Sequence, residues 1–408
     1  MKNSQFNRTA IWATIFAFFL TLSAYSQADT AKKPVEEKPK KWFELLSLRG
    51  YAQLRYNRLL ETNDKLKCDQ CDKSWGDNNT IFLRRARIVL FGDVHPHLGV
   101  YIQFDYAAQP ASSTQQHFLQ IRDAYFDLNF DKKKVYRVRV GQSKVPFGFE
   151  NLQSSQNRLP LDRADALNSA LPNERDMGAF FYWTPVKRQE IMEALNKDGM
   201  KHSGNYGMFA LGFYNGQTAN TPEKNDLFHV VSRFSYPMNI GSQVIEPHVE
   251  AYTGRFVLLS TSEGVATSSD KEYDDQRVAG GFVLYPKPFG IQAEYNVGTS
   301  PGYDAETDSI GQQDVSGGQV TLCYRRKIDK HVLIPFVRAQ YFRGSKKAEL
   351  DARHYEVDEY EFGVEWLPFK NFELTAMYTM SHRVTADYIN ELNDQEGSLV
   401  RLQLQFNY

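Results

Sequence analysis

The sequence predicts an all-β fold: a transmembrane antiparallel β-barrel of about 16 strands. Three observations favour this class: an export signal at the N-terminus, apolar and polar residues that alternate through most of the chain, and connections that are short and long in turn. A barrel strand presents only every second side chain to lipid, so its average hydropathy resembles that of a soluble protein. The mean hydropathy of −0.52 over 408 residues agrees with this pattern.

The first 28 residues have the features of a secretory signal peptide. Two basic residues precede an apolar stretch from Ala10 to Leu22, which is short for a membrane span, and small residues follow it. We expect residues 1–28 to be removed; the alternative is an uncleaved anchor helix. Residues 29–41 combine Lys, Glu and Pro with few apolar side chains, and residues 29–46 are expected to form a flexible periplasmic segment. The barrel is then expected to comprise residues 47–408.

Each strand predicted after residue 46 has one apolar and one polar face, because the side chains alternate with a period of two. The final strand shows this clearly, with an apolar face made of Val400, Leu402, Leu404, Phe406 and Tyr408. Its aromatic last residue resembles the C-terminal strand by which bacterial outer-membrane barrels are recognised for insertion. The alternative is the last strand of a soluble β-sandwich.

Short turns alternate with longer loops, as they do in outer-membrane barrels. The longer loops are expected near residues 61–79, 109–117, 215–226, 256–276, 299–315, 344–356 and 383–397. Two stretches interrupt the alternation. Residues 185–199 are predicted to form a periplasmic helical insert, with Thr184 as its N-cap and Pro185 at its first position. Residues 147–174, after the fifth strand, form the longest interruption, and a loop of this length in a compact fold is usually functional.

The 48 basic and 49 acidic side chains almost cancel, so no global field for nucleic acid is expected. Alternation nevertheless places basic residues inside the barrel on the first, second and fifth strands: Arg49, Arg55, Arg85, Arg87, Arg137 and Arg139. It places acidic residues inside on the late strands: Glu246, Glu250, Glu294, Glu361, Glu365 and Glu373. Arg84 falls on the apolar face, where the outer rim is the favourable place for it. Arginine-lined pores select anions, and the alternative is that the lumen charges only pair with one another.

Several segments resemble the phosphate-selective porin O and P family. They are RVGQSKVPFGFENLQSSQNRLPLDRADALNSA with the following ERDMG, then FLRRARI, RDAY and GFYNG. The resemblance implies a sixteen-stranded homotrimeric barrel in the outer membrane of a Gram-negative bacterium, in contact with lipid and lipopolysaccharide. It also implies a third extracellular loop, here residues 147–174, that folds into the pore as a constriction. Arg158 and Arg163 on that loop, and Lys144 before it, are the implied anion-attracting residues.

The family implies a porin for the passive diffusion of small anions such as phosphate, with selectivity from lumen and third-loop arginines. A non-conducting outer-membrane barrel that acts in adhesion, as a scaffold or as a receptor is the alternative, and a secreted soluble β protein is a third possibility. The sequence has no recognisable nucleophile, metal or phosphate-binding motif, so we expect neither an enzyme nor a cofactor or metal. In the first long loop, Cys68 and Cys71 are expected to form a local disulfide, with a metal site or free thiols as alternatives. Cys323 has no evident partner.

Overall fold

The computed structural model describes residues 41–60, 80–108, 117–389 and 392–408. The fold described below lies within one compact unit, residues 42–408. Among the described residues, no helix is both long and apolar enough to cross a membrane.

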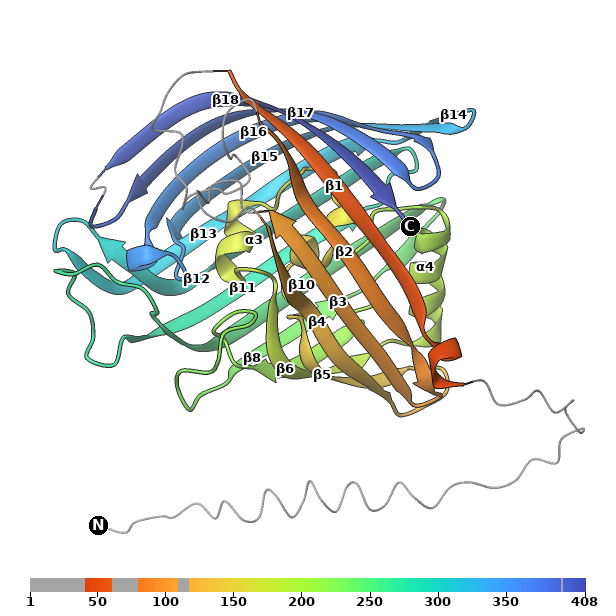
Figure 1. Ribbon diagram of the computed structural model, residues 1–408, viewed down its shortest axis with the longest axis horizontal. Coiled ribbons are helices and arrows are strands. Elements are labelled where there is room, and N and C mark those ends of the chain that lie inside the picture. The colour runs from red at the N-terminus through yellow and green to blue at the C-terminus, as the bar shows by residue number, and fades with distance from the viewer. Residues whose placement is uncertain (1–40, 61–79, 109–116, 390–391) are drawn as a thin grey trace, which may run out of the picture. The chain divides into compact units, whose positions relative to one another are not determined.

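Residues 42–408 form a closed antiparallel barrel (Figure 1). Eighteen strands are found in one sheet among the described residues, but β9 continues β8 along the same partner β10, and β14 continues β13 along β15, so the wall has sixteen spanning strands. The strands are β1 (Ser47–Leu59), β2 (Thr80–His95), β3 (Leu98–Ala108), β4 (His117–Asn129), β5 (Tyr136–Lys144), β6 (Arg175–Trp183), β7 (Phe209–Tyr214), β8 (His229–Ser235), β9 (Met238–Ile240), β10 (Gln243–Val257), β11 (Glu272–Leu284), β12 (Phe289–Asp304), β13 (Ser309–Tyr324), β14 (Arg326–Ile328), β15 (His331–Ser345), β16 (His354–Phe369), β17 (Phe372–Ala386) and β18 (Asn393–Asn407). The predicted fold class and strand number are confirmed.

The faces of the strands follow the predicted alternation. On β16, Tyr360 and Phe362 are 57% and 47% exposed on the outer face, whereas Glu361 and Glu365 are each 1% exposed on the lumen side. On β18, Phe406 is exposed and Arg401 is buried in the same way. A charge at the middle of the lipid face would cost about 2–4 kcal/mol, which explains why the charged residues lie inside.

Two predicted loops are mostly strand. Near residues 383–397, β17 and β18 stay paired up to Thr385 and Asn393, which leaves residues 387–392 as the connection. The long connection expected near residues 299–315 is mostly β-sheet, because β12 and β13 stay paired up to Asp304 and Ser309, which leaves only residues 305–308 as the turn. These strand ends contain Gly302, Gly311 and polar side chains. A strand end without an apolar face gives no period-two signal, although its backbone still pairs with its neighbour.

The last residues of the segment before the barrel have regular structure. Residues 29–40 lie outside the described residues, whereas Trp42–Leu45 form a short 3-10 helix. The carbonyl oxygen of Leu45 lies so close to Gly92 on β2 that a Cβ at this glycine would overlap it. The end of the expected tether is therefore held against the barrel.

The predicted helical insert is present as helix α4 (Val186–Lys197). Its first turn starts one residue later than expected, because Pro185 occupies the N-cap position. The hydroxyl of Thr184 does not cap the helix but donates to Asn205 Oδ1 at 2.9 Å. Gly199 follows the helix with φ +66°, a conformation that favours glycine.

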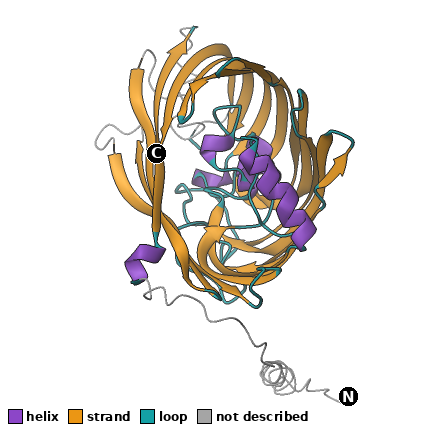
Figure 2. Cartoon of the chain, turned by 90° about the vertical axis from the view of Figure 1, so that its right-hand side faces the viewer, coloured by secondary structure: helices purple, strands orange, loops and turns teal. Residues whose placement is uncertain are grey.

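The connection between β5 and β6 folds into the barrel, as expected for the third loop (Figure 2). It contains three short helical segments: α2 (Phe149–Leu152), η4 (Ser155–Asn157) and α3 (Asp165–Ala170). Almost all of its apolar residues are fully buried against the inner wall; α3, for example, packs through Ala166 on Phe342 and Tyr355. We call residues 145–174 the inner loop.

Glu174, the last residue of the inner loop, is surrounded by four basic side chains. Arg158, Arg163, Arg175 and Lys144 all lie within ion-pair distance of its carboxylate, which is 4% exposed. Burial by itself raises the pKa of Glu174, but Lys144, Arg163 and Arg158 together hold it well below its usual value. This carboxylate therefore ties the two ends of the inner loop together.

Replacing Glu174 with Gln should destabilise the inner loop strongly, because four buried cations would lose their shared counter-ion. Removing one partner of a buried ion pair typically costs about 3–5 kcal/mol. The free energy of unfolding of the refolded barrel in urea is the appropriate measurement. The same change at Glu263, an exposed residue of another loop, should leave it unchanged. Equal stability of both variants would contradict the role of Glu174.

The barrel closes between β1 and β18. The backbone of Tyr408 and that of Gly50 exchange two hydrogen bonds of 2.8 and 3.0 Å, and the Tyr408 hydroxyl donates to the carbonyl oxygen of Arg87 at 3.1 Å. A Cβ at Gly50 would lie 2.6 Å from the Tyr408 ring. The terminal aromatic ring therefore covers the seam at a position where only glycine leaves room.

A charge at position 408 should impair closure, because Tyr408 lies on the lipid face and covers the seam. Tyr408→Asp is expected to reduce the fraction of protein that migrates as a heat-modifiable folded barrel on an unheated SDS gel. Tyr408→Phe, which loses only the hydroxyl contact, should fold nearly as well as the wild type. Normal yields of folded barrel in the Tyr408→Asp variant would argue against this assignment.

Candidate functional site

A cavity of about 540 Å³ opens inside the barrel between the early strands, the inner loop and the segment that contains α4. We call it the vestibule. Its charged lining consists of five basic residues, Arg49, Arg137, Arg139, Lys144 and Arg175, and two acidic ones, Asp123 and Glu193. His202 also lines it, and burial lowers the pKa of this imidazole, so the ring contributes no positive charge at neutral pH. The excess of fixed charge in the vestibule is positive.

Two arginines of β5 share one carboxylate. Arg139 donates to both oxygens of Asp127 at 2.8 and 2.9 Å, and Arg137 lies 3.7 Å from the same group. The Arg139 guanidinium also lies 3.7 Å from the centre of the Tyr125 ring. Aromatic rings hold a guanidinium in place without neutralising it, so this pair retains one uncompensated positive charge.

Two further arginines enter the lumen at β-bulges. The β1–β2 register skips Arg84, and the β3–β4 register skips Arg122. Arg122 is 9% exposed and lies 3.7 Å from Asp105, while Arg84 lies 3.6 Å from Asp162 of the inner loop. The assignment of Arg84 to the lipid face is therefore wrong, because an extra residue in one strand places two consecutive side chains on one face.

Arg85 and Arg87 lie beside these bulges on the lumen wall. Arg87 donates to Asp105 at 2.8 Å, to the Tyr51 hydroxyl at 2.8 Å and to Ser155 Oγ of the inner loop at 3.1 Å. Arg85 is 9% exposed and pairs with no carboxylate within the described part of the chain. Arg87 and Arg122 thus share the carboxylate of Asp105, and Arg85 lies beside Arg87 on the same wall.

The other predicted pathway residues have different surroundings. Arg55 is held by both oxygens of Asp162, by Gln403 and by the carbonyl oxygen of Leu161. Lys144 donates to three carbonyl oxygens of the inner loop, those of Asn151, Leu152 and Gln153, at 2.6 to 3.2 Å. Arg49, in contrast, is exposed and lies over the Phe91 ring.

Arg158 and Arg163 point into the inner loop. Arg158 pairs with Glu174, and Arg163 donates to Asn151 Oδ1 at 2.8 Å besides its contact with Glu174. Neither residue lines the vestibule. Their contacts give them a part in folding the loop, and a part in selectivity remains a prediction.

The late-strand glutamates are covered by the inner loop or paired with basic residues. Glu294 accepts the backbone N–H groups of Phe149 and Glu150 at 2.5 and 3.0 Å, and Glu250 accepts that of Gly148 at 2.9 Å. The others pair with basic side chains: Glu246 with Arg233, Glu361 with Arg338 and Arg401, and Glu365 and Glu373 with Lys201. The acidic wall therefore contributes no unpaired row of carboxylates to the vestibule.

Sequence reasoning missed the basic residues that the late strands also contribute. Arg338, Arg383 and Arg401 are buried and pair with acids of the inner loop: Arg338 with Glu150, Arg383 with Asp165 and Arg401 with Asp162. Each lies on the polar face of its strand, so the alternation contained the signal. The positions of their acidic partners in a non-alternating loop could not be inferred from that pattern.

The described residues include one of the three cysteines and one cluster of residue types that can bind metal. Cys68 and Cys71 lie outside the described residues, and Cys323 is a free thiol. Among the described residues, His248, Glu250 and Glu294 lie with their ligand atoms within 4.8 Å of one another. The carboxylates of this cluster accept the hydrogen bonds from residues 148–150, which gives them a role in anchoring the inner loop.

Solved structures with the same fold are outer-membrane proteins. The outer-membrane channel DcaP of Acinetobacter baumannii is 15% identical, with a TM-score of 0.55 over 89% of this chain and 97% of that one. OmpF of Salmonella typhi, solved in complex with daunomycin, is 12% identical with a TM-score of 0.55 and the same coverage. OmpT of Vibrio cholerae, expressed in the outer membrane, is 10% identical with a TM-score of 0.51 over 89% of this chain and 97% of that one. No curated protein matches the sequence.

A family profile covers nearly the whole chain. The profile described as phosphate-selective porin O and P matches residues 62–408, which include all of the barrel except β1. The closed barrel and its outer-membrane neighbours agree with this match. The chain therefore belongs to the phosphate-selective porin O and P family and is a porin of the bacterial outer membrane.

Proposed function

We propose that this porin passes small anions by passive diffusion and that phosphate is among its solutes. The observation that carries the proposal is the asymmetry of the lumen: the inner loop covers the acidic late strands, and the vestibule remains along the basic early strands. The family name supports phosphate as a solute.

Arg85, Arg87 and Arg122, which belong to the lumen wall and not to the vestibule lining, are proposed as the group that attracts the anion, with Arg137 and Arg139 acting in the vestibule. Guanidinium groups are always charged and match the paired oxygens of phosphate. Fixed charges on a narrow low-dielectric wall also concentrate counter-ions. Screening over about 10 Å at 0.1 M salt weakens the influence of more distant charges.

We also propose that the protein assembles as a homotrimer in contact with lipid and lipopolysaccharide, as the family resemblance implies. Apolar side chains such as Leu119, Ile121 and Phe126 on β4 are exposed on the outer wall of the single chain, which supports burial against lipid or a second copy. A non-conducting receptor or scaffold is the competing function, and conductance separates the two.

The wild-type protein in a planar bilayer should conduct chloride and phosphate in preference to potassium. Reversal potentials under a salt gradient, measured first in KCl and then in potassium phosphate, give the sign of the selectivity directly. A cation-selective pore would refute the anion mechanism, and a folded barrel without conductance would favour the receptor alternative.

Neutralising the arginines near Asp105 should reduce the anion preference. The double variant Arg85→Gln/Arg122→Gln is expected to lower the anion-to-cation permeability ratio by about twofold or more, because these charges lie on the lumen wall. Arg87 is retained so that Asp105 keeps its partner. Arg326→Gln, at an exposed position of the β14 hairpin, is the matched control and should leave the ratio unchanged.

The two variants must be compared in the same salt gradient. If both change the ratio equally, the effect reflects overall charge, and the assignment to Arg85 and Arg122 is wrong. Changes at Arg158 or Arg163 are less suitable, because both pair with Glu174 and would disturb the inner loop first.

A further inference from the structure

The segment between β6 and β7, residues 184–208, is far longer than the other connections at its end of the barrel. These have at most six residues each, for example 96–97, 130–135 and 370–371. Figure 2 looks into this end and shows α4 lying across the opening. We call residues 184–208 the strap.

One face of the strap is packed inside the barrel. Leu195 is 1% exposed and clusters with Met200, with Phe149 of the inner loop, and with Val244 and Val283 of the wall. Gln153 of the inner loop also donates to the carbonyl oxygen of Lys201 at 2.9 Å. The helical insert is therefore packed against the inner loop and the barrel wall and does not form a separate element.

The strap reaches the opposite wall through Lys201. Its ammonium lies 2.8 Å from Glu365 Oε2 on β16 and 3.1 Å from Glu373 Oε2 on β17. The strap starts after the sixth wall strand, and β16 and β17 are the fourteenth and fifteenth of sixteen, so half of the wall lies between them. Burial alone would lower the pKa of Lys201, but Glu365 and Glu373 outweigh it and raise the pKa above its ordinary value.

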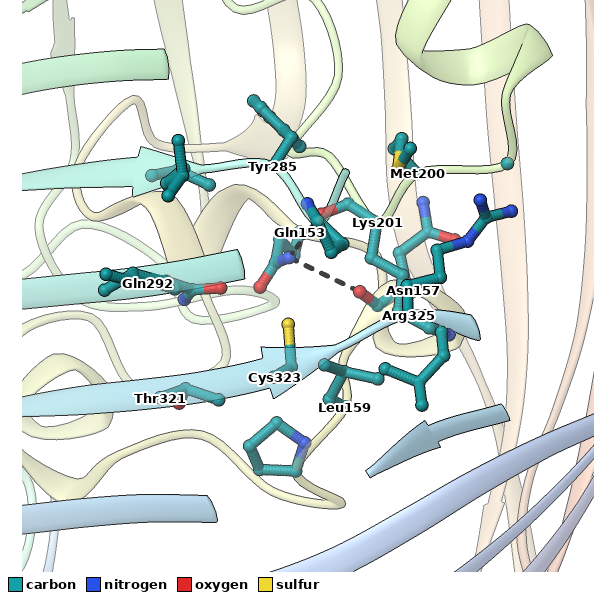
Figure 3. Close-up of a pocket in the computed structure, with 17 residues that line it drawn as sticks. Gln153, Asn157, Leu159, Met200, Lys201, Tyr285, Gln292, Thr321, Cys323 and Arg325 are labelled. Atoms are coloured by element: carbon teal, nitrogen blue, oxygen red, sulfur yellow. Dashed lines mark hydrogen bonds between the residues drawn. The ribbon is translucent and has the colours of Figure 1, made fainter. Parts of the chain in front are cut away.

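The strap separates two regions of the lumen. On one side, Met192, Glu193, Asn196 and residues 202–206 form part of the vestibule lining. On the other side, Gly199, Met200 and Lys201 cover a small cavity of about 40 Å³ that also contacts Gln153 and Asn157 of the inner loop. Figure 3 shows the Cys323 thiol directed into this second cavity, below Gln153.

Positive backbone dihedral angles flank Lys201. Gly199, Gly204 and Gly207 have φ values of +66°, +99° and +83°. Residues other than glycine rarely adopt this conformation, and a Cβ at Gly199 or Gly204 would make only ordinary contacts, 3.9 Å from Arg325 and 3.5 Å from Tyr206. The segment around Lys201 therefore lies between turns that depend on glycine, outside helix α4.

We propose that the strap is a specificity element of the periplasmic exit, with Lys201 as the positioning residue that latches it to Glu365 and Glu373. Closed, it confines solutes to the basic vestibule and sets their size limit. Released, it opens a wider path along the late strands and leaves two carboxylates without their cation. The inference rests on conduction through the lumen but not on the sign of the selectivity.

The native thiol of Cys323 provides the test. In a Cys68→Ser/Cys71→Ser background, Lys201→Ala should increase the rate at which a charged methanethiosulfonate reagent labels Cys323 by about tenfold or more, because loss of a buried ion-pair partner shifts the strap toward its released state. The same variant should show higher conductance, admit larger solutes in liposome swelling and shift the reversal potential toward cations. Lys197→Ala, an exposed lysine on the same segment, is the control and should behave as the wild type.

Two further variants keep the test decisive. Lys201→Arg should label Cys323 as slowly as the wild type. Glu373→Gln removes only one partner of Lys201, so its labelling rate should lie between those of the wild type and Lys201→Ala; this variant replaces Lys201→Ala if the latter does not fold. Wild-type labelling and conductance in folded Lys201→Ala or Glu373→Gln would overturn the proposal. A wild-type pore that proves cation-selective would refute the anion function alone, because the labelling readout does not depend on it.

Discussion

Pairing of buried charges inside the barrel is the constraint on which the rest of the structure depends. A charge removed from water without a partner costs several kcal/mol, and the inner loop brings four acidic residues into the lumen: Glu150, Asp162, Asp165 and Glu174. Asp162 alone meets Arg55, Arg84 and Arg401, from strands on both sides of the barrel seam. The ion pairs between these acids and the wall arginines therefore fix the position of the inner loop in the barrel.

The position of the loop decides which wall a solute meets. The late strands carry both acidic and basic side chains, and the inner loop pairs with both kinds. Backbone N–H groups of residues 148–150 donate to the glutamates, and the acidic residues of the loop pair with the arginines. The early strands keep more basic than acidic side chains beside the vestibule. A chain whose net charge is −1 can therefore present a local positive field, because the cancelling charges are covered by the loop.

Several of the features proposed to act in transport lie where the regular barrel pattern is interrupted. Bulges at Arg84 on β2 and Arg122 on β4 each add an arginine to the lumen side of the wall. The strap replaces a tight turn with a helix packed against the inner loop. Bulges and long insertions cost the wall little, since its hydrogen bonds continue on either side of them. They change the shape and charge of the lumen while the barrel itself remains intact.

The sequence by itself determined the wall of this protein. The period-two alternation is local and depends on whether each side chain faces lipid or the lumen, so the number of strands and their two faces could be predicted. The interruption of the alternation indicated the helical insert, and the family resemblance suggested the inward third loop. The alternation failed where strand ends have no apolar face, as near Gly302, and where a bulge shifts the phase, as at Arg84.

Only the tertiary structure decided which charges remain available to a solute. Arg158 and Arg163 pair with Glu174, and Lys201 crosses the opening to β16 and β17, through contacts between residues that are distant in the sequence or lie in loops without periodicity. Alternation predicts that a side chain faces the lumen. Which group it pairs with there depends on the path of the inner loop and the strap in three dimensions.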